Sequence, residues 1–210
     1  MPGLTKPLRV SLAVMPGTYS PMNSNFWPTT ALAYLGPVAR QEDAEVSVLD
    51  AHLDGTSEDG VVSWLRQRPA DIIGFSVPSE IVWKHTLPVL DAIARLKEFS
   101  GTWVVAGGVD ASLRTATLQR EGPRLDAIVL GEGEITFREI LRHRREARAG
   151  DPVPPLPGLV ARRAAGSWTD AGPRRPIEDL DDLPDPDYAF AAQAASQGRL
   201  EAVGLASSRG

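Results

Sequence analysis

The chain of 210 residues carries a formal net charge of −5 and contains no cysteine. It is long enough for one domain with a substantial core plus an appendage. The negative charge gives no reason to expect a nucleic acid partner, and the missing cysteines exclude disulfides, thiolate catalysis and cysteine-ligated metal in this chain. No apolar stretch is long enough for a signal peptide or a membrane span, so we expect a cytoplasmic protein without a membrane partner.

Five apolar stretches have the composition of buried strands, and each precedes a stretch with helical patterning. The predicted strands are Arg9–Met15, Glu45–Asp50, Asp71–Val77, Thr102–Ala106 and Ala127–Leu130. The predicted helices are Thr29–Gln41, one capped by Ser57 or Asp59, Ile81–Phe99, a short one near Ser112 and Glu134–Arg148. Strands alternating with helices indicate a parallel sheet, and right-handed crossovers favour a doubly wound, Rossmann-like α/β fold with five strands in flavodoxin-like order. Pro37 should kink or shorten the first helix.

The composition changes at Ala149. A proline-rich stretch leads into a predicted hairpin formed by Gly158–Arg163 and Ser167–Thr169, which turns at Ala165-Gly166. An acidic, proline-punctuated connector, Pro176–Tyr188, follows it. We expect a short helix at Ala189–Ser196 and a further strand at Ala202–Ser207.

Three loops follow the third, fourth and fifth predicted strands, and each contains small or polar residues. The carboxyl ends of parallel strands lie at one edge of the sheet, and ligands bind in the crevice beyond that edge. We therefore take these loops as the candidate cofactor-binding site and assign no residue to catalysis or to a metal ion. The candidate residues are Ser76, Val77, Pro78, Ser79, Glu80, Gly107, Gly108, Asp110, Ser112, Gly131, Glu132, Gly133 and Glu134.

Each motif in these loops also has a structural explanation. Gly107-Gly108 lets a ligand approach the backbone, but a tight strand-to-helix turn would need the same glycines. Glu134 falls in the first turn of a predicted helix, where an acid is favourable against the dipole, whereas Glu132 has no such reason and is a candidate contact for a ligand hydroxyl or amide. No histidine or third acid lies nearby in sequence, which argues against an acid–base pair or a metal site. Ser76 either lines a pocket or satisfies a neighbouring carbonyl group.

Several short stretches, taken in order, form a larger pattern. They are Leu32–Leu35, Val48–Ala51 with Gly55, Ala70–Ser76, Val105–Gly108, Asp126–Glu134, Pro157–Val160, Ile177–Tyr188 and Ser207–Gly210. In this order they resemble the N-terminal cobalamin (B12)-binding half of cobalamin-dependent radical S-adenosylmethionine (SAM) enzymes. The last stretch resembles the residues that immediately precede the C-x-x-x-C-x-x-C cluster motif of that family. The resemblance covers nearly the whole chain.

The resemblance implies where cobalamin binds. The corrin ring would lie over the carboxyl ends of the strands, beside or above Ser76–Glu80, and its nucleotide tail would thread into the sheet. Gly107, Gly108, Asp110 and Ser112 would line the tail channel, and Gly131–Glu134 would form its far wall. Relatives often have a histidine where this chain has Asp110, which leaves that contact open.

The segment Asp50-Ala-His-Leu-Asp-Gly55 matches the D-x-H-x-x-G motif, through which some cobalamin proteins donate a histidine to cobalt. In those proteins the motif follows the first strand, whereas here it follows the second. We therefore interpret the match as coincidental and His52 as a solvent-facing loop residue. The resemblance implies a cobalt ion without a protein histidine.

The resemblance also implies a domain organisation. Residues 1–148 would form the cobalamin-binding domain, 149–187 the hairpin and connector, and 188–210 the start of a truncated radical SAM barrel. The family also uses an iron–sulfur [4Fe–4S] cluster and SAM, whose ligands this chain lacks. The chain would thus be the cobalamin-binding module of a B12-dependent radical SAM methyltransferase, inactive alone, with the missing radical SAM barrel as its partner.

Two alternatives remain open. A degenerate scaffold or interaction domain of the same fold would have its crevice closed by Tyr19, Phe26, Trp27 or Trp83. A flavin or nucleotide binder of flavodoxin type is the third hypothesis, although the first loop lacks a compact phosphate-binding segment rich in serine and threonine. The substrate of a parent enzyme is not readable from these residues.

Overall fold

The computed structural model describes residues 6–17, 29–198 and 200. Most of the loop after the first strand therefore lies outside the described residues, with Tyr19, Phe26 and Trp27. The predicted strand Ala202–Ser207 and the terminal Ser207–Gly210 also lie outside them.

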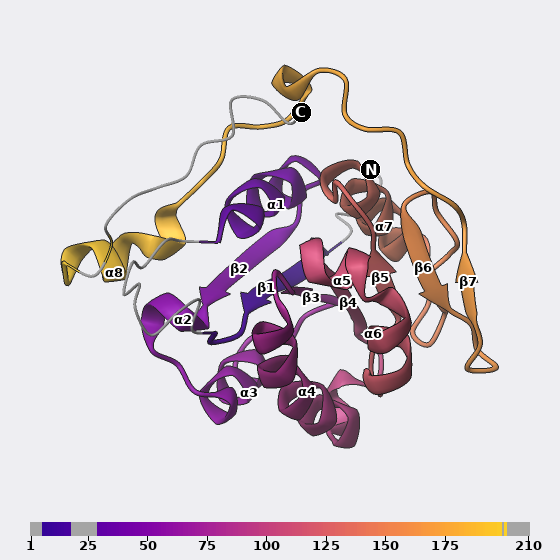
Figure 1. Cartoon of the computed structure of the whole chain (residues 1–210), viewed down its shortest axis with the longest axis horizontal. Coiled ribbons are helices and arrows are strands. Elements are labelled where there is room, and N and C mark those ends of the chain that lie inside the picture. Colours follow the sequence, from indigo (N-terminus) through magenta and orange to yellow (C-terminus); the bar gives the residue numbers. More distant parts are fainter. Residues whose placement is uncertain (1–5, 18–28, 199, 201–210) are drawn as a thin grey trace.

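Five parallel strands form the centre of the molecule (Figure 1). They are β1 (Arg9–Val14), β2 (Glu45–Asp50), β3 (Ile72–Ser76), β4 (Trp103–Gly107) and β5 (Ala127–Val129). Their order in the sheet is β2-β1-β3-β4-β5, and every neighbouring pair is parallel. The predicted doubly wound fold in flavodoxin-like order is confirmed. The topological switch point, where ligands bind in such sheets, lies between β1 and β3.

Helices cover both faces of this sheet. Those of the α/β units are α1 (Thr30–Gln41), α2 (Ala51–Asp54), α3 (Glu58–Arg66), α4 (Glu80–Arg95), α5 (Val109–Leu113), α6 (Thr115–Glu121) and α7 (Glu134–Glu146). Figure 1 shows α1 and α7 on one face of the sheet and α3 and α4 on the other. A buried apolar cluster fills both interfaces, with Leu12, Ile72 and Ile73 among its most buried members. No helix of the described part of the chain is long and apolar enough to span a membrane.

The hairpin extends this sheet. Strands β6 (Leu159–Arg162) and β7 (Trp168–Asp170) add antiparallel to β5, so the sheet has seven strands and mixed direction. The prediction of five strands plus a separate hairpin was therefore incomplete. The physical reason is that β5 has only three residues, all buried, and pairing with β6 saves its hydrogen-bonding groups from an open edge.

Helices α4 and α2 differ from the predictions. Helix α4 ends at Arg95 because Leu96 has extended backbone angles, and the separate 3-10 helix η1 (Lys97–Phe99) follows. Helix α2 was not predicted; the Asp50 carboxylate caps it by accepting a hydrogen bond of 3.1 Å from the Leu53 amide. His52 therefore lies half-buried in a helix, and its assignment to a solvent-facing loop was wrong.

Helix α1 continues through Pro37 despite its missing amide proton. The Ala33 carbonyl, four residues earlier, loses its helical donor because of this proline. The Asp187 amide of the connector donates to that carbonyl at 2.9 Å, and the Asp187 carboxylate pairs with Arg40 at 2.6 Å. The proline thus creates the acceptor to which the connector binds.

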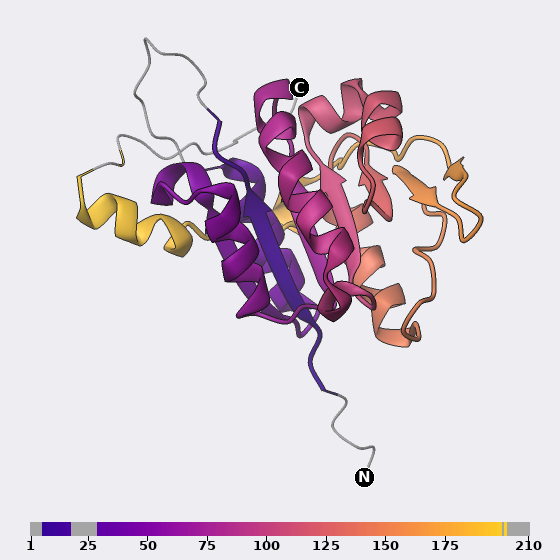
Figure 2. The same ribbon diagram turned by 90° about the horizontal axis from the view of Figure 1, so that it is seen from below.

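The connector crosses from the hairpin to the opposite edge of the sheet. It contains the 3-10 helices η2 (Leu180–Asp182) and η3 (Ala189–Ala191), followed by α8 (Ala192–Ser196). Figures 1 and 2 show α8 at the β2 edge and the hairpin at the other edge. Leu53 of α2, Ala191 and Ala194 form a second small apolar cluster there. The predicted short helix at Ala189–Ser196 is thus present as η3 and α8.

Candidate functional site

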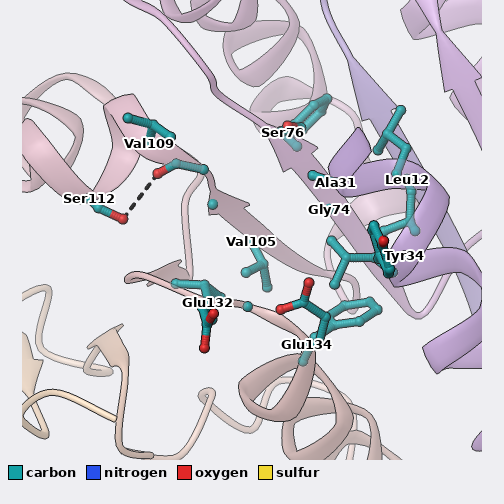
Figure 3. Close-up of a pocket in the computed structure, with 18 of the residues that line it drawn as sticks. Leu12, Ala31, Tyr34, Gly74, Ser76, Val105, Val109, Ser112, Glu132 and Glu134 are labelled. Carbon is teal, nitrogen blue, oxygen red and sulfur yellow. Dashed lines mark hydrogen bonds between the residues drawn. The ribbon is translucent and has the colours of Figure 1, made fainter. Parts of the chain in front are cut away.

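A cavity of about 510 Å³ lies at the carboxyl edge of the parallel sheet (Figure 3). Its walls come from β1, β3 and β4, from helix α1, and from the loops that follow β4 and β5. It therefore occupies the switch point, where this fold class binds its ligands. Trp83, one of the residues expected to close a degenerate crevice, does not line it; the indole is buried and donates to Glu121 at 3.0 Å.

The structure gathers eight of the thirteen predicted site residues around this cavity. They are Ser76, Gly107, Gly108, Ser112, Gly131, Glu132, Gly133 and Glu134. They come from the ends of β3, β4 and β5 and the residues that follow them, between positions 76 and 134, and they meet because these strands are parallel neighbours. The other five predicted residues, described next, do not line the cavity.

Four of these five residues, all except Pro78, have structural partners. The Val77 amide donates to the Gly107 carbonyl at 2.7 Å, and the next residue is Pro78. Ser79 caps α4 by accepting from the Val82 amide. The hydrogen bond from Lys84, at 3.0 Å, lowers the pKa of the exposed Glu80. Asp110 forms a bidentate ion pair with Arg114, at 2.7 and 2.8 Å, that holds its carboxylate away from the cavity.

The glycine pair after β4 has a steric function. Gly108 has a φ of +115°, and a Cβ atom there would lie 2.8 Å from the Val77 carbonyl oxygen. The turn that packs these two strand ends together therefore requires glycine. Gly107 is less constrained, since its Cβ would lie 3.4 Å from Val129.

The Ser112 hydroxyl joins two walls of the cavity. It donates to the Gly108 carbonyl at 3.0 Å and accepts from the Gly131 amide at 3.0 Å. The loops after β4 and β5 are thereby fixed relative to each other. Figure 3 shows the hydrogen bond from Ser112 to the loop beside Val109.

Gly74 is a site residue that the sequence analysis did not select. It lies in the middle of β3, with Leu12 beside it on β1 and Val105 on β4, and all three line the cavity. The missing side chain leaves a notch in this cross-strand row that a Cβ would begin to fill, at 2.8 Å from Leu12 Cδ2. A glycine inside a buried strand was the available signal, because such a glycine often marks close approach of a ligand.

Helix α1 contributes a second wall that was missed. Thr30, Ala31, Leu32, Tyr34 and Leu35 all line the cavity. The helix was expected, but its place over the switch point follows from the topology rather than from its own residues. Its start is fixed by Thr29, whose amide and hydroxyl both donate to the buried Asp50 carboxylate at 3.0 and 2.9 Å. Burial raises the pKa of Asp50 despite these bonds.

The two glutamates after β5 point in different directions. Glu132 accepts a hydrogen bond of 2.6 Å from the Ile177 amide, so its carboxylate ties the connector to the cavity wall. Glu134, the first residue of α7, is only 6% exposed, and its carboxylate points into the cavity (Figure 3). The site therefore combines apolar walls with a buried acid.

Two apolar side chains are exposed at the rim. Val109 and Leu113 of α5 line the mouth of the cavity with exposures of 67% and 80%. Among the described residues, no three acidic or histidine side chains are grouped closely enough to hold a metal ion. His52 does not line the cavity.

Fold and site together define a doubly wound α/β domain with a ligand cavity at the carboxyl edge of its sheet. Residues 24–141, more than half of the chain, match the family model of the B12 binding domain. The chain therefore belongs to the B12-binding domain family, and its cofactor is cobalamin.

The chain is also similar to several individual proteins. A methyltransferase of Pyrococcus horikoshii, described only as uncharacterised, is 26% identical over 182 residues, which cover 84% of this chain and 38% of that protein. The cobalamin-dependent SAM radical enzyme OxsB, solved with aqua-cobalamin and SAM, superposes with a TM-score of 0.77 at 20% identity, covering 96% of this chain and 26% of OxsB. The radical SAM methyltransferase TsrM of Kitasatospora setae gives a TM-score of 0.60 at 21% identity, covering 78% and 30%. The chain thus spans well under half the length of these proteins.

Proposed function

We propose that the cavity at the carboxyl edge receives the nucleotide tail of cobalamin, while the corrin ring rests on the rim outside it. The volume of about 510 Å³ is that of a small-molecule pocket. A nucleoside-sized group fits such a space, whereas the corrin macrocycle with its amide side chains does not. The glycines support this fit, because the backbone at Gly74, Gly107 and Gly131 presents no side chain to an entering group.

The residues of the chain would hold the cofactor in two ways. The apolar walls from α1 and the sheet would enclose the tail, and the exposed Val109 and Leu113 would lie under the apolar face of the corrin ring. Burial of these two side chains would contribute about 25 cal/mol for each Å² removed from water. When bound, cobalamin supplies a cobalt ion for methyl-group transfer.

We further propose that the domain serves a B12-dependent radical SAM methyltransferase. The supporting observation is that the similar proteins include a methyltransferase and radical SAM enzymes several times longer than this chain. A [4Fe–4S] cluster is held by cysteine thiolates, and these 210 residues contain none. The cluster and SAM sites of such an enzyme would therefore lie outside these residues, and this part alone would bind cobalamin without catalysing methyl transfer.

The open, glycine-lined cavity is the main support for this function, so the test measures cobalamin binding and its dependence on the shape of the cavity. Purified protein mixed with hydroxocobalamin should retain a corrin absorption spectrum through desalting. Gly74→Val should reduce that retention at least tenfold, because the new side chain fills the notch between Leu12 and Val105. Gly101→Ala is the matched control; its Cβ meets only the Ala149 Cβ at 3.8 Å, at the opposite edge of the sheet.

Circular dichroism of both variants establishes that they fold. A wild-type protein that elutes colourless would support the degenerate scaffold instead. Equal retention by Gly74→Val and the wild-type protein would place the tail elsewhere.

A further inference from the structure

The cavity contains one feature that enclosure of an apolar base does not explain. Most of its lining side chains are apolar, and the buried polar ones are Tyr34, Ser76 and Glu134. Glu134 is the single carboxylate among these three. Glu134 is only 6% exposed, so its carboxyl group is enclosed by the cavity walls rather than by bulk solvent.

The second acid of the same loop does not share this position. The Glu132 carboxylate accepts from the Ile177 amide at 2.6 Å and belongs to the attachment of the connector. The Glu134 carboxylate instead points toward the space beside Val105 and Tyr34 (Figure 3). A ligand that fills the cavity therefore meets the Glu134 carboxylate.

The chemistry of a carboxylate limits which part of the cofactor it can meet. An ionised carboxylate only accepts hydrogen bonds, and it repels the negatively charged phosphodiester of the nucleotide tail. The amide side chains belong to the corrin ring, which is too large to enter. The donors that remain at the end of the tail are the ribose hydroxyls and, when the base is protonated, its ring N–H.

We propose that Glu134 is a specificity-determining residue that accepts a hydrogen bond from the nucleoside end of the cobalamin tail. This inference rests on the proposed function, because it assumes that the tail enters the cavity. It assigns to Glu134 the distinction between corrinoids that carry a nucleotide tail and corrinoids that lack one. The apolar walls would enclose the tail, and Glu134 would select it.

The alternative is that Glu134 only stabilises the first turn of α7 through the helix dipole. A control isolates this contribution, because Glu58 is also the first residue of a helix, α3, and does not line the cavity. Glu58→Gln changes an acid at the same helical position. It should therefore reproduce the loss of stability that follows from removing an acid at a helix N-terminus, to which its contact with His85 adds.

The experiment compares hydroxocobalamin with cobinamide, which has the corrin ring but no nucleotide, by absorbance titration of the wild-type protein and its variants. Glu134→Gln should weaken cobalamin binding by about 10- to 100-fold, the range for loss of a hydrogen bond to a charged group. Its affinity for cobinamide should remain within about twofold of that of the wild-type protein. Glu58→Gln should leave both affinities unchanged. If Glu134→Gln does not fold, Glu134→Asp serves instead, because its shorter side chain keeps the negative charge but places it further from the ligand. Its affinity for cobalamin should fall by a smaller factor, and its affinity for cobinamide should not change.

A third corrinoid separates the two donors. p-Cresolyl cobamide keeps the ribose but has no ring nitrogen in its base. An equal loss with this ligand assigns the bond to a ribose hydroxyl, and a loss confined to cobalamin assigns it to the protonated base; both results support a nucleoside contact. Equal weakening of cobalamin and cobinamide, or of neither, would overturn the role of Glu134. Failure of the wild-type protein to bind cobalamin would overturn the proposed function itself.

Discussion

At the scale of single residues, two glycines of the site have positive φ for different reasons. Gly108 has a φ of +115° and faces the Val77 carbonyl, whereas Gly131 has a φ of +65° and would have nothing within 4 Å of an added Cβ. The first glycine is required by backbone angle and by space, the second by backbone angle alone. A substitution at Gly131 therefore measures the cost of backbone strain alone, and a substitution at Gly108 measures that strain plus the steric overlap with Val77.

Gly108→Ala should lower the free energy of unfolding by about 3 kcal/mol, because left-handed strain adds to the overlap with a backbone carbonyl that cannot move away. Gly131→Ala should cost only about 1 kcal/mol, the strain alone. Urea denaturation of both variants measures the difference. Equal losses of unfolding free energy in the two variants would show that the loop at Val77 relaxes and that the overlap with the Val77 carbonyl contributes little.

Eight of the thirteen residues predicted from sequence line the cavity, and the reasons for the exceptions are physical. The loops after β3, β4 and β5 were predicted because the carboxyl ends of parallel strands lie at one edge of the sheet. Asp110 does not line the cavity because it pairs with Arg114, and this ion pair depends on the helical phase after a turn whose geometry the sequence does not give. Tyr34 was missed because a helical aromatic residue looks the same whether it covers a core or a cavity.

At the scale of elements, the connector and α1 depend on each other. Pro37 removes the amide that would bond to the Ala33 carbonyl, and Asp187 of the connector supplies the replacement. The sequence predicted that Pro37 would kink or shorten the helix, whereas the structure shows that the helix is not shortened and continues to Gln41. The reason for the difference lies 150 residues further along the chain, where no local pattern indicates it. Because the same helix lines the cavity, connector attachment also positions a wall of the site.

Pro37→Ala should therefore stabilise the protein by less than about 1 kcal/mol, although proline inside a helix costs about 3 kcal/mol relative to alanine. The restored amide at position 37 competes with the Asp187 amide for the Ala33 carbonyl. The free energy that the helix gains is therefore offset by the hydrogen bond that the connector loses. Pro88→Ala in α4, at an exposed position, is the matched control and should gain about 1–3 kcal/mol. Thermal unfolding measures both, and hydrogen exchange at Asp187 should increase in Pro37→Ala only. A full gain for Pro37→Ala would mean that the connector bond contributes nothing.

At the scale of the whole molecule, the hairpin and the parallel sheet share one core. Val153, Leu159 and Val160 belong to the same buried cluster as the central strands, and β6 covers the edge of the three-residue β5. The boundary proposed from sequence, after residue 148, follows a change of composition. The hydrophobic contacts instead continue across it, so we propose that the cooperative unit extends through β7.

Leu159→Ala tests this continuity, since Leu159 is fully buried in β6 at the junction with β5. A cavity in a shared core should lower the free energy of global unfolding by about 2–5 kcal/mol. Native-state hydrogen exchange should report that loss at the amides of β4 and β3, which lie two and three strands away from β6. Arg163→Ala, at the exposed hairpin turn, should change the same amides by less than about 0.5 kcal/mol. If Leu159→Ala accelerates exchange only within the hairpin, the hairpin unfolds independently and the parallel sheet is a separate cooperative unit.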